Sequence, residues 1–292
     1  MITYASYRLA AFLSRRLPRR WLYRLARDVA DLFYAADRRG RTAVQRNLSV
    51  ILQARGERPD DAELSRMARQ TFRNFGKYVA DFFRYSLSTA DEVARIVRCE
   101  HEEYIDAALA PGKGVLVVSA HVGNWELGGM LWTARGRRLN AVALPQRLRN
   151  VNRLFQEQRA SRGLQVLPLG RAAARVLECL RRGEAVALLA DRDVTPRSVT
   201  VPFFGSPARL PSGPVRLAVK SGAPLLPGFV LRQPDDTFVL RYYPPLAPEG
   251  RAAEPALQAR LARILEEVIG AQPHQWFMFR DFWSESETPL EP

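Results

Sequence analysis

Residues that bind metals or form disulfides are scarce in this sequence of 292 residues, which has 2 cysteines and 3 histidines. Cys99 and Cys179 lie far apart, and the scattered histidines supply no ligand spacing around them. The sequence therefore predicts no metal site. We expect the two cysteines to be free thiols in a reducing compartment.

Long hydrophobic runs are also missing. The apolar run near the start, Leu9–Leu13, is short, and the arginines of RRLPRR follow it rather than precede it. A secretory signal has the opposite order, so none is predicted. No stretch reaches the ~18 apolar residues that a membrane-spanning helix requires. We expect a protein that stays on the cytoplasmic side of any membrane it touches.

Positive charge is abundant and comes almost entirely from arginine. The formal net charge is +14, and only Lys77, Lys113 and Lys220 are lysines. The planar guanidinium binds phosphates and carboxylates through two parallel hydrogen bonds, so we expect an anionic partner. A lipid surface, a phosphorylated substrate and a nucleic acid all meet this description. The arginines spread along the whole chain and no nucleic-acid-binding module is recognisable, which disfavours nucleic acid.

The first ninety residues have the apolar periodicity of helices. Residues 21–33 and 61–86 place their apolar and aromatic side chains at helical spacing, with arginines between them. We predict an N-terminal helical region over residues 1–90. Its apolar faces either pack on the rest of the protein or, for the first helices, lie in a membrane interface beside anionic lipid.

The pattern changes at Pro111, where short apolar runs begin to alternate with helical segments. Continuous apolar strands separated by helices are typical of a parallel sheet covered on both faces. We therefore predict an α/β fold, a largely parallel central sheet flanked by helices, over residues 91–292, integrated with the N-terminal region into one domain. Residues 237–243 alternate more and are predicted as an edge strand. The predicted inner strands are 114–120, 140–145, 164–169, 185–190 and 223–231.

The stretch VVSAHVGNWELGG combines a predicted strand with a histidine and a glutamate. His121 follows the strand end, where open α/β sheets bind their ligands. If a helix begins near Asn124, a favourable N-cap residue, Glu126 falls in its first turn and can fold back toward His121. A carboxylate on one imidazole nitrogen leaves the other free to take a proton. The alternative is that both side chains only cap the helix.

Several stretches in order along the chain resemble one family. HVGNWE is similar to the His-x-x-x-x-Asp/Glu motif of the lysophospholipid acyltransferase superfamily. RNLS near Asn47, the region Leu189–Pro227 with its Phe-Phe-Gly, and PHQWFMFRDFW at Pro273–Trp283 resemble elements of one bacterial branch. That branch contains the lipid A late acyltransferases (lauroyl and myristoyl transferases) and the phosphatidylinositol mannoside acyltransferases.

The resemblance implies an activity and a set of site residues. A family member moves a fatty acyl chain from an acyl thioester to a hydroxyl, with His121 as the general base and Glu126 as its acidic partner. The residues that the resemblance assigns to substrate binding are Gln146, Arg147, Arg159, Asp191 and Arg192. The glutamine at 146 departs from the glutamate or arginine of relatives, and so removes an acceptor-side carboxylate. The aromatic residues of 273–283 either pack in the core or contact the acyl chain.

The resemblance also implies the partners. We expect acyl carrier protein or coenzyme A to supply the thioester as a co-substrate, with no cofactor, and a membrane glycolipid or lipid A-type precursor to accept the chain. The protein would bind peripherally to the cytoplasmic face of the plasma (inner) membrane, an anionic surface. A lysophospholipid acyltransferase is the alternative enzyme, and a basic lipid- or nucleic-acid-binding protein is the alternative without catalysis.

Overall fold

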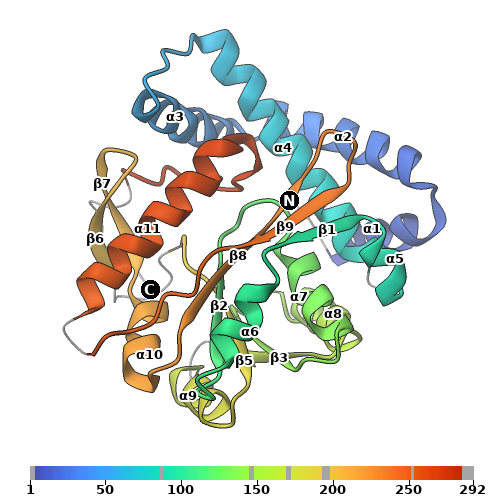
Figure 1. The fold of residues 1–292 in the computed structure, drawn as a ribbon. Helices are drawn as coiled ribbons and strands as arrows, with labels where there is room; N and C mark the ends of the chain where they lie inside the picture. Colours follow the sequence, from blue (N-terminus) through green and yellow to red (C-terminus); the bar gives the residue numbers. More distant parts are fainter. Residues whose placement is uncertain are drawn as a thin grey trace.

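The computed structural model describes residues 4–85, 88–144, 148–168, 172–192, 198–250 and 253–284. Helices precede the strands, which then alternate with further helices (Figure 1). The strands are β1 (Val97–Glu100), β2 (Val115–Ser119), β3 (Leu139–Ala143), β4 (Leu164–Pro168), β5 (Ala185–Leu189), β6 (Ser198–Phe203), β7 (Ser206–Pro211), β8 (Leu225–Arg232) and β9 (Phe238–Tyr242).

A seven-stranded sheet forms the centre, in the order β1-β9-β8-β2-β5-β3-β4, and β6 and β7 form a separate hairpin. The strands from β8 to β4 run parallel to one another. Strand β9 pairs antiparallel with β8 and parallel with β1. The prediction of a largely parallel sheet is confirmed. The prediction that residues 237–243 form an edge strand is wrong, because β1 pairs with the outer side of β9.

Helices cover both faces of this sheet. One face packs against α5 (Ala90–Ala94), α6 (Glu103–Leu109) and α7 (Trp125–Ala134), and the other against α9 (Ala172–Arg181), α10 (Gly213–Ser221) and α11 (Glu254–Ala271) (Figure 1). Leu116 and Val118 of β2 point to the second face, and Val115 and Val117 to the first. Because successive side chains alternate across a strand, a strand buried on both faces must be apolar throughout.

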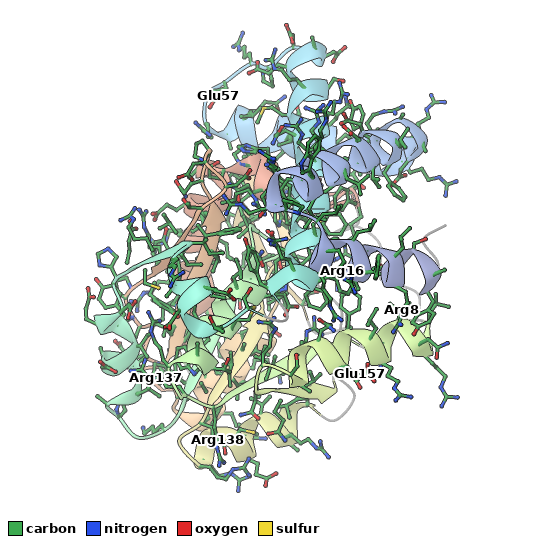
Figure 2. All side chains as sticks on the ribbon, turned by 90° about the vertical axis from the view of Figure 1, so that its right-hand side faces the viewer. Arg8, Arg16, Glu57, Arg137, Arg138 and Glu157 are labelled. Atoms are coloured by element: carbon green, nitrogen blue, oxygen red, sulfur yellow. The ribbon has the colours of Figure 1, made fainter. Side chains whose placement is uncertain are left out.

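The N-terminal region is helical, as predicted. It consists of α1 (Tyr4–Arg16), α2 (Arg19–Ala36), α3 (Arg38–Ala54) and α4 (Asp61–Arg84). Asp60 caps α4 by accepting the amide hydrogen of Glu63 at 2.7 Å. The helix α8 (Arg149–Ala160) lies against α1, and Figure 2 shows Arg8 and Arg16 on α1 above Glu157 on α8.

The apolar faces of α1 and α2 are only partly buried. Leu22 and Tyr23 are in the core, whereas large apolar side chains elsewhere on these helices are exposed. The exposed set is Tyr4, Leu9, Phe12, Trp21, Leu25, Val29, Leu32 and Phe33, and we call it the N-terminal apolar face. Within the described part of the chain, no helix is both long and apolar enough to cross a membrane.

Candidate active site

His121 and Asp191 lie side by side at the carboxyl ends of two adjacent strands. Parallel pairing of β2 with β5 sets Ser119 opposite Leu189, and two residues further on each strand is followed by one of the pair. Imidazole Nδ1 of His121 lies 2.8 Å from Asp191 Oδ1. A carboxylate only accepts hydrogen bonds, so Nδ1 carries the hydrogen and Nε2 is left as the nitrogen that can take a proton.

The Asp191 carboxylate is fully buried and satisfied by three donors. Its Oδ2 accepts the backbone N–H of His121 at 2.9 Å and the indole N–H of Trp276 at 2.8 Å. Burial by itself raises the pKa of this carboxyl, but the charge of His121 and these hydrogen bonds lower it to about 2. Asp191 is therefore an anion that holds the imidazole in one orientation.

The turn after His121 is rigid. Gly123 has a φ of 61°, and a Cβ there would lie 1.9 Å from the Val230 carbonyl oxygen, so only glycine fits. Backbone bonds from Phe277 N–H to His121 O (2.8 Å) and from Gly123 N–H to Gln275 O (2.9 Å) attach the turn to the C-terminal segment. Asn124 ends the turn and caps α7, as predicted, by accepting the Leu127 N–H at 3.3 Å.

Glu126 has a different partner from the predicted one. Its carboxylate accepts hydrogen bonds from Nε and Nη2 of Arg159 on α8, with Nη2 at 2.6 Å from Glu126 Oε1, while the imidazole of His121 binds Asp191. Placed in the first turn of α7, Glu126 is aimed at α8, which carries the guanidinium. Although burial lowers the pKa of Arg159, the Glu126 charge raises it above its ordinary value. Glu126 thus orients Arg159 and stabilises its positive charge, and it does not bind the imidazole of His121.

A cavity of about 1840 Å³ opens beside His121. His121, Glu126, Arg159 and Arg192 all line it, so the structure brings these four predicted residues to one space. Leu25 and other exposed residues of α1 and α2 line the same cavity. Single ligand pockets usually measure roughly 300–1000 Å³, so this one has room for two large substrates.

One part of the cavity lies between α7 and the sheet and is lined by small residues. Ala141, Ala187 and Val117 are in register on β3, β5 and β2, and all three line it. Gly128 and Gly129 of α7 line it as well, where a Cβ on Gly129 would lie 3.3 Å from Leu164 Cδ2. Larger side chains at these positions would fill the space between α7 and the sheet. Because the space is lined by apolar residues, it suits a hydrocarbon chain.

Aromatic rings form another wall beside the base. Trp125 stacks on Tyr78 with centroids 4.3 Å apart, and its ring lies 5.1 Å from that of His121. Phe277 lies against both aromatic rings. Trp276, Phe277 and Phe282 are buried in the core, one of the two predicted alternatives, whereas Phe279 is half-buried and lines the cavity.

Of the five predicted substrate-binding residues, the structure describes Arg159, Asp191 and Arg192. Asp191 was expected to hold a substrate head group, but it is buried against His121 and Trp276 and has no surface to offer one. Arg192 lines the cavity, and its Nη2 donates to the carbonyl of Phe277. Burial lowers the pKa of Arg192, opposed by the charge of Asp191. Gln146 and Arg147 lie outside the described residues.

Sequence reasoning missed two residues that hold the site together. Trp276 donates to Asp191, and Asn47 of RNLS fastens the C-terminal segment by donating to the carbonyl oxygens of Met278 (3.1 Å) and Arg280 (2.8 Å). For Asn47 the available signal was a polar residue on the apolar face of α3, at helical spacing from Val44 and Ile51. Both cysteines are free, and the described residues contain no group of three or more His, Cys, Asp or Glu side chains that could hold a metal ion.

Comparison with known proteins identifies the family. The family model described as bacterial lipid A biosynthesis acyltransferase matches residues 2–285. The chain is 32% identical over 257 residues to the phosphatidylinositol mannoside acyltransferase of Mycobacterium tuberculosis (strain CDC 1551 / Oshkosh), covering 86% of this chain and 79% of the relative. It is 29% identical over 255 residues to the protein of that name from Mycolicibacterium smegmatis, covering 86% and 82%.

Among solved structures, the 1-acyl-sn-glycerophosphate (LPA) acyltransferase PlsC from Thermotoga maritima matches with a TM-score of 0.39 and 15% identity, over 87% of this chain and 98% of that one. The strand ends of the sheet thus carry a buried acid and a histidine at the wall of a large cavity. The chain belongs to the bacterial lipid A biosynthesis acyltransferase family, and the predicted resemblance is confirmed.

Proposed function

We propose that this protein transfers a fatty acyl chain from an acyl thioester to a hydroxyl group of a membrane glycolipid, with His121 as the general base. The single observation that carries the proposal is the bond between His121 Nδ1 and Asp191 at the wall of the cavity. The buried carboxylate stabilises the imidazolium that forms when Nε2 takes a proton.

The reaction balances with this one base. Nε2 takes the proton of the acceptor hydroxyl, and the oxygen attacks the thioester carbonyl carbon. The C–S bond then breaks, the acyl group stays on the acceptor oxygen, and the imidazolium returns its proton to the leaving thiolate. General-base catalysis of this kind contributes typically ~10²–10⁴-fold in rate. Coenzyme A or acyl carrier protein supplies the thioester.

The cavity supports two lipid substrates. The apolar space beneath Gly128 and Gly129 accommodates an acyl chain, and the cationic side chains of Arg159 and Arg192 face the same cavity, where they can contact phosphate on the acceptor or donor. The relatives at 29–32% identity are named for phosphatidylinositol mannoside, which favours that acceptor over a lipid A precursor.

We also propose that the protein works peripherally, on the cytoplasmic face of the membrane. The N-terminal apolar face includes Leu9, Leu25 and Val29, which also line the cavity, so an acceptor in the bilayer has a direct path to His121. Exposed arginines on the same two helices match an anionic surface.

A direct assay tests the activity. Purified protein is incubated with one acyl donor, palmitoyl-coenzyme A or palmitoyl-acyl carrier protein, together with one acceptor. The acceptors, each tested in its own reaction, are phosphatidylinositol mannoside, a lipid A precursor and a lysophospholipid. Mass spectrometry of the lipids then shows which acceptor gains an acyl group. We expect the mannoside to be acylated by wild type and not by His121→Ala. If only the lysophospholipid were acylated, the proposed glycolipid acceptor would be wrong. If His121→Ala were as active as wild type, His121 would not be the general base.

A further inference from the structure

A buried ion pair joins the N-terminal helices to the sheet close to the His121 turn. Asp81 of α4 and Arg232 of β8 are bonded through Asp81 Oδ2 and Arg232 Nη2, and their side chains are 0% and 7% exposed. Tyr23 of α2 donates its hydroxyl hydrogen to Asp81 Oδ1 at 2.6 Å. A buried ion pair adds little stability compared with apolar residues of the same volume. Its two charges therefore call for another role.

The Asp81 end of the pair contacts the residue that closes the turn. Asp81 Oδ2 accepts a bond from Asn124 Nδ2 at 3.3 Å, and Asn124 is itself buried. With its amide nitrogen held by the carboxylate, the amide oxygen of Asn124 faces Leu127 N–H and caps α7. Asp81 is thus linked through Asn124 to the end of the turn and to the start of α7.

The Arg232 end reaches the same turn from the C-terminal segment. The backbone N–H of Arg232 donates to Gln275 Oε1 at 2.9 Å, and Gln275 Nε2 donates to the Arg232 carbonyl at 2.8 Å. Gln275 in turn accepts the Gly123 N–H through its backbone oxygen. Trp276, which binds Asp191, is the next residue in the chain. Asp81 is therefore linked to the turn through Asn124, and Arg232 is linked to it through Gln275.

We propose that Asp81 is a positioning residue for acyl transfer, which fixes the His121 turn through Asn124. The proposal rests on the proposed function of His121 as the base. Displacing a catalytic group by ~1 Å can cost about 10²-fold in rate without loss of the fold. Loss of the Asp81–Asn124 bond is therefore expected to lower kcat while substrate contacts, and with them KM, are kept.

Two double variants separate positioning from stability. Asp81→Leu/Arg232→Met and Asp81→Asn/Arg232→Met both remove the buried charges and keep similar volume. They differ in the side-chain oxygen, which only asparagine keeps and which can accept the bonds from Asn124 and Tyr23. Tyr23→Phe removes the second of these bonds alone and should keep the wild-type kcat. Arg69→Met is the control: Arg69 also lies on α4, but it binds Asp31 of α2 at 2.7 Å and not the Asp81–Arg232 pair.

We expect the leucine double variant to have a kcat at least about tenfold below that of the asparagine double variant, with KM within about twofold. Arg69→Met should keep the wild-type kcat. Equal kcat values for the two folded double variants would overturn the proposal.

Asn124→Ser covers the case in which the leucine variant does not fold. Serine still caps a helix but is too short to bind Asp81, and the ion pair stays intact. We expect the same fall in kcat, and an unchanged kcat would overturn the proposal. If wild type transfers no acyl group at all, the proposed function has failed on its own. Hydrogen exchange then decides about Asp81: the amides of residues 122–127 should exchange faster in Asn124→Ser than in wild type, and equal protection counts against positioning.

Discussion

His121 and Asp191 are seventy residues apart in the chain, and His121 Nδ1 lies 2.8 Å from Asp191 Oδ1. Their strands pair in the sheet, and both residues occupy the same place beyond the strand ends. The carboxylate of Asp191 is fully buried and also accepts a hydrogen bond from the indole N–H of Trp276, so a substrate cannot contact it directly. In the proposed reaction it can act only through the imidazole, which it orients and whose positive charge it stabilises.

Replacing Asp191 is therefore expected to abolish most of the activity. Asp191→Asn keeps the volume but cannot stabilise the imidazolium, and its amide can present a donor to the ring. We expect a loss of ~10²-fold or more in kcat. Thermal unfolding serves as the control, since a preserved Tm assigns the loss to chemistry. Activity above about a tenth of wild type would contradict the role of Asp191 in orienting the base.

The pH dependence of stability should show the charge of Asp191 only in strong acid. Its pKa in the folded protein is about 2, below the ~3.9 of an unfolded aspartate. A lowered pKa contributes stability above the unfolded value, which is lost as pH falls toward the folded one. The stabilisation of wild type relative to Asp191→Asn should shrink as the pH falls from about 4 toward 2. Urea unfolding across this range measures it, and a difference that does not shrink there would contradict the lowered pKa of Asp191.

The pair Arg159–Glu126 should matter for stability as well as for substrate binding. Their side chains are 17% and 10% exposed, so Arg159→Met leaves a largely buried carboxylate without its partner. Breaking a fully buried pair costs ~3–5 kcal/mol, and this partly exposed one about 2 kcal/mol. In urea unfolding, the double variant Glu126→Gln/Arg159→Met should recover part of that loss, because neither charge is then left alone. A double variant less stable than Arg159→Met would show that the two residues act separately.

The small residues facing α7 should limit the length of the acyl chain. Ala141 is in register with Ala187 and lines the cavity, so Ala141→Phe places a ring in the space assigned to the acyl chain. We expect kcat/KM for palmitoyl donors to fall by roughly tenfold or more, and that for octanoyl donors to change much less. Ala173→Phe, on α9 at another part of the cavity, is the control. An equal loss for both chain lengths would place the acyl chain elsewhere.

Much of the fold was predictable because it depends on local pattern. Apolar runs gave the inner strands of the sheet, and the capping preference of Asn124 gave the start of α7. The partner of His121 was not predictable in this way. Glu126 is near in sequence, whereas Asp191 becomes a neighbour only through the pairing of β2 with β5. Periodicity also could not predict which apolar residues of α2 are buried. Leu22 is buried and Trp21 is exposed because of how α2 packs on its neighbours.

The N-terminal helices are expected to bind the protein to an anionic membrane. Arg15, Arg16, Arg20 and Arg24 are exposed beside the N-terminal apolar face, whereas Arg19 is half-buried near Tyr23 and contributes less. Each exposed arginine near an anionic leaflet adds about 1 kcal/mol, so replacing these four with glutamine should release the protein from vesicles. Binding of wild type should weaken with salt, because exposed charges are screened within ~8–10 Å.

Vesicle co-sedimentation with a matched control measures this contact. The control replaces Arg138, Arg175, Arg260 and Arg263, four exposed arginines on other elements, so that both variants lose the same charge; Figure 2 shows Arg138 far from Arg8 and Arg16. We expect the control to pellet with phosphatidylglycerol vesicles as wild type does, and the N-terminal variant to remain in the supernatant. Acyl transfer to detergent-dispersed acceptor should be preserved in both, since none of the eight residues touches His121. If the two variants bind vesicles equally, total charge rather than these helices governs the attraction, and the N-terminal apolar face has another partner.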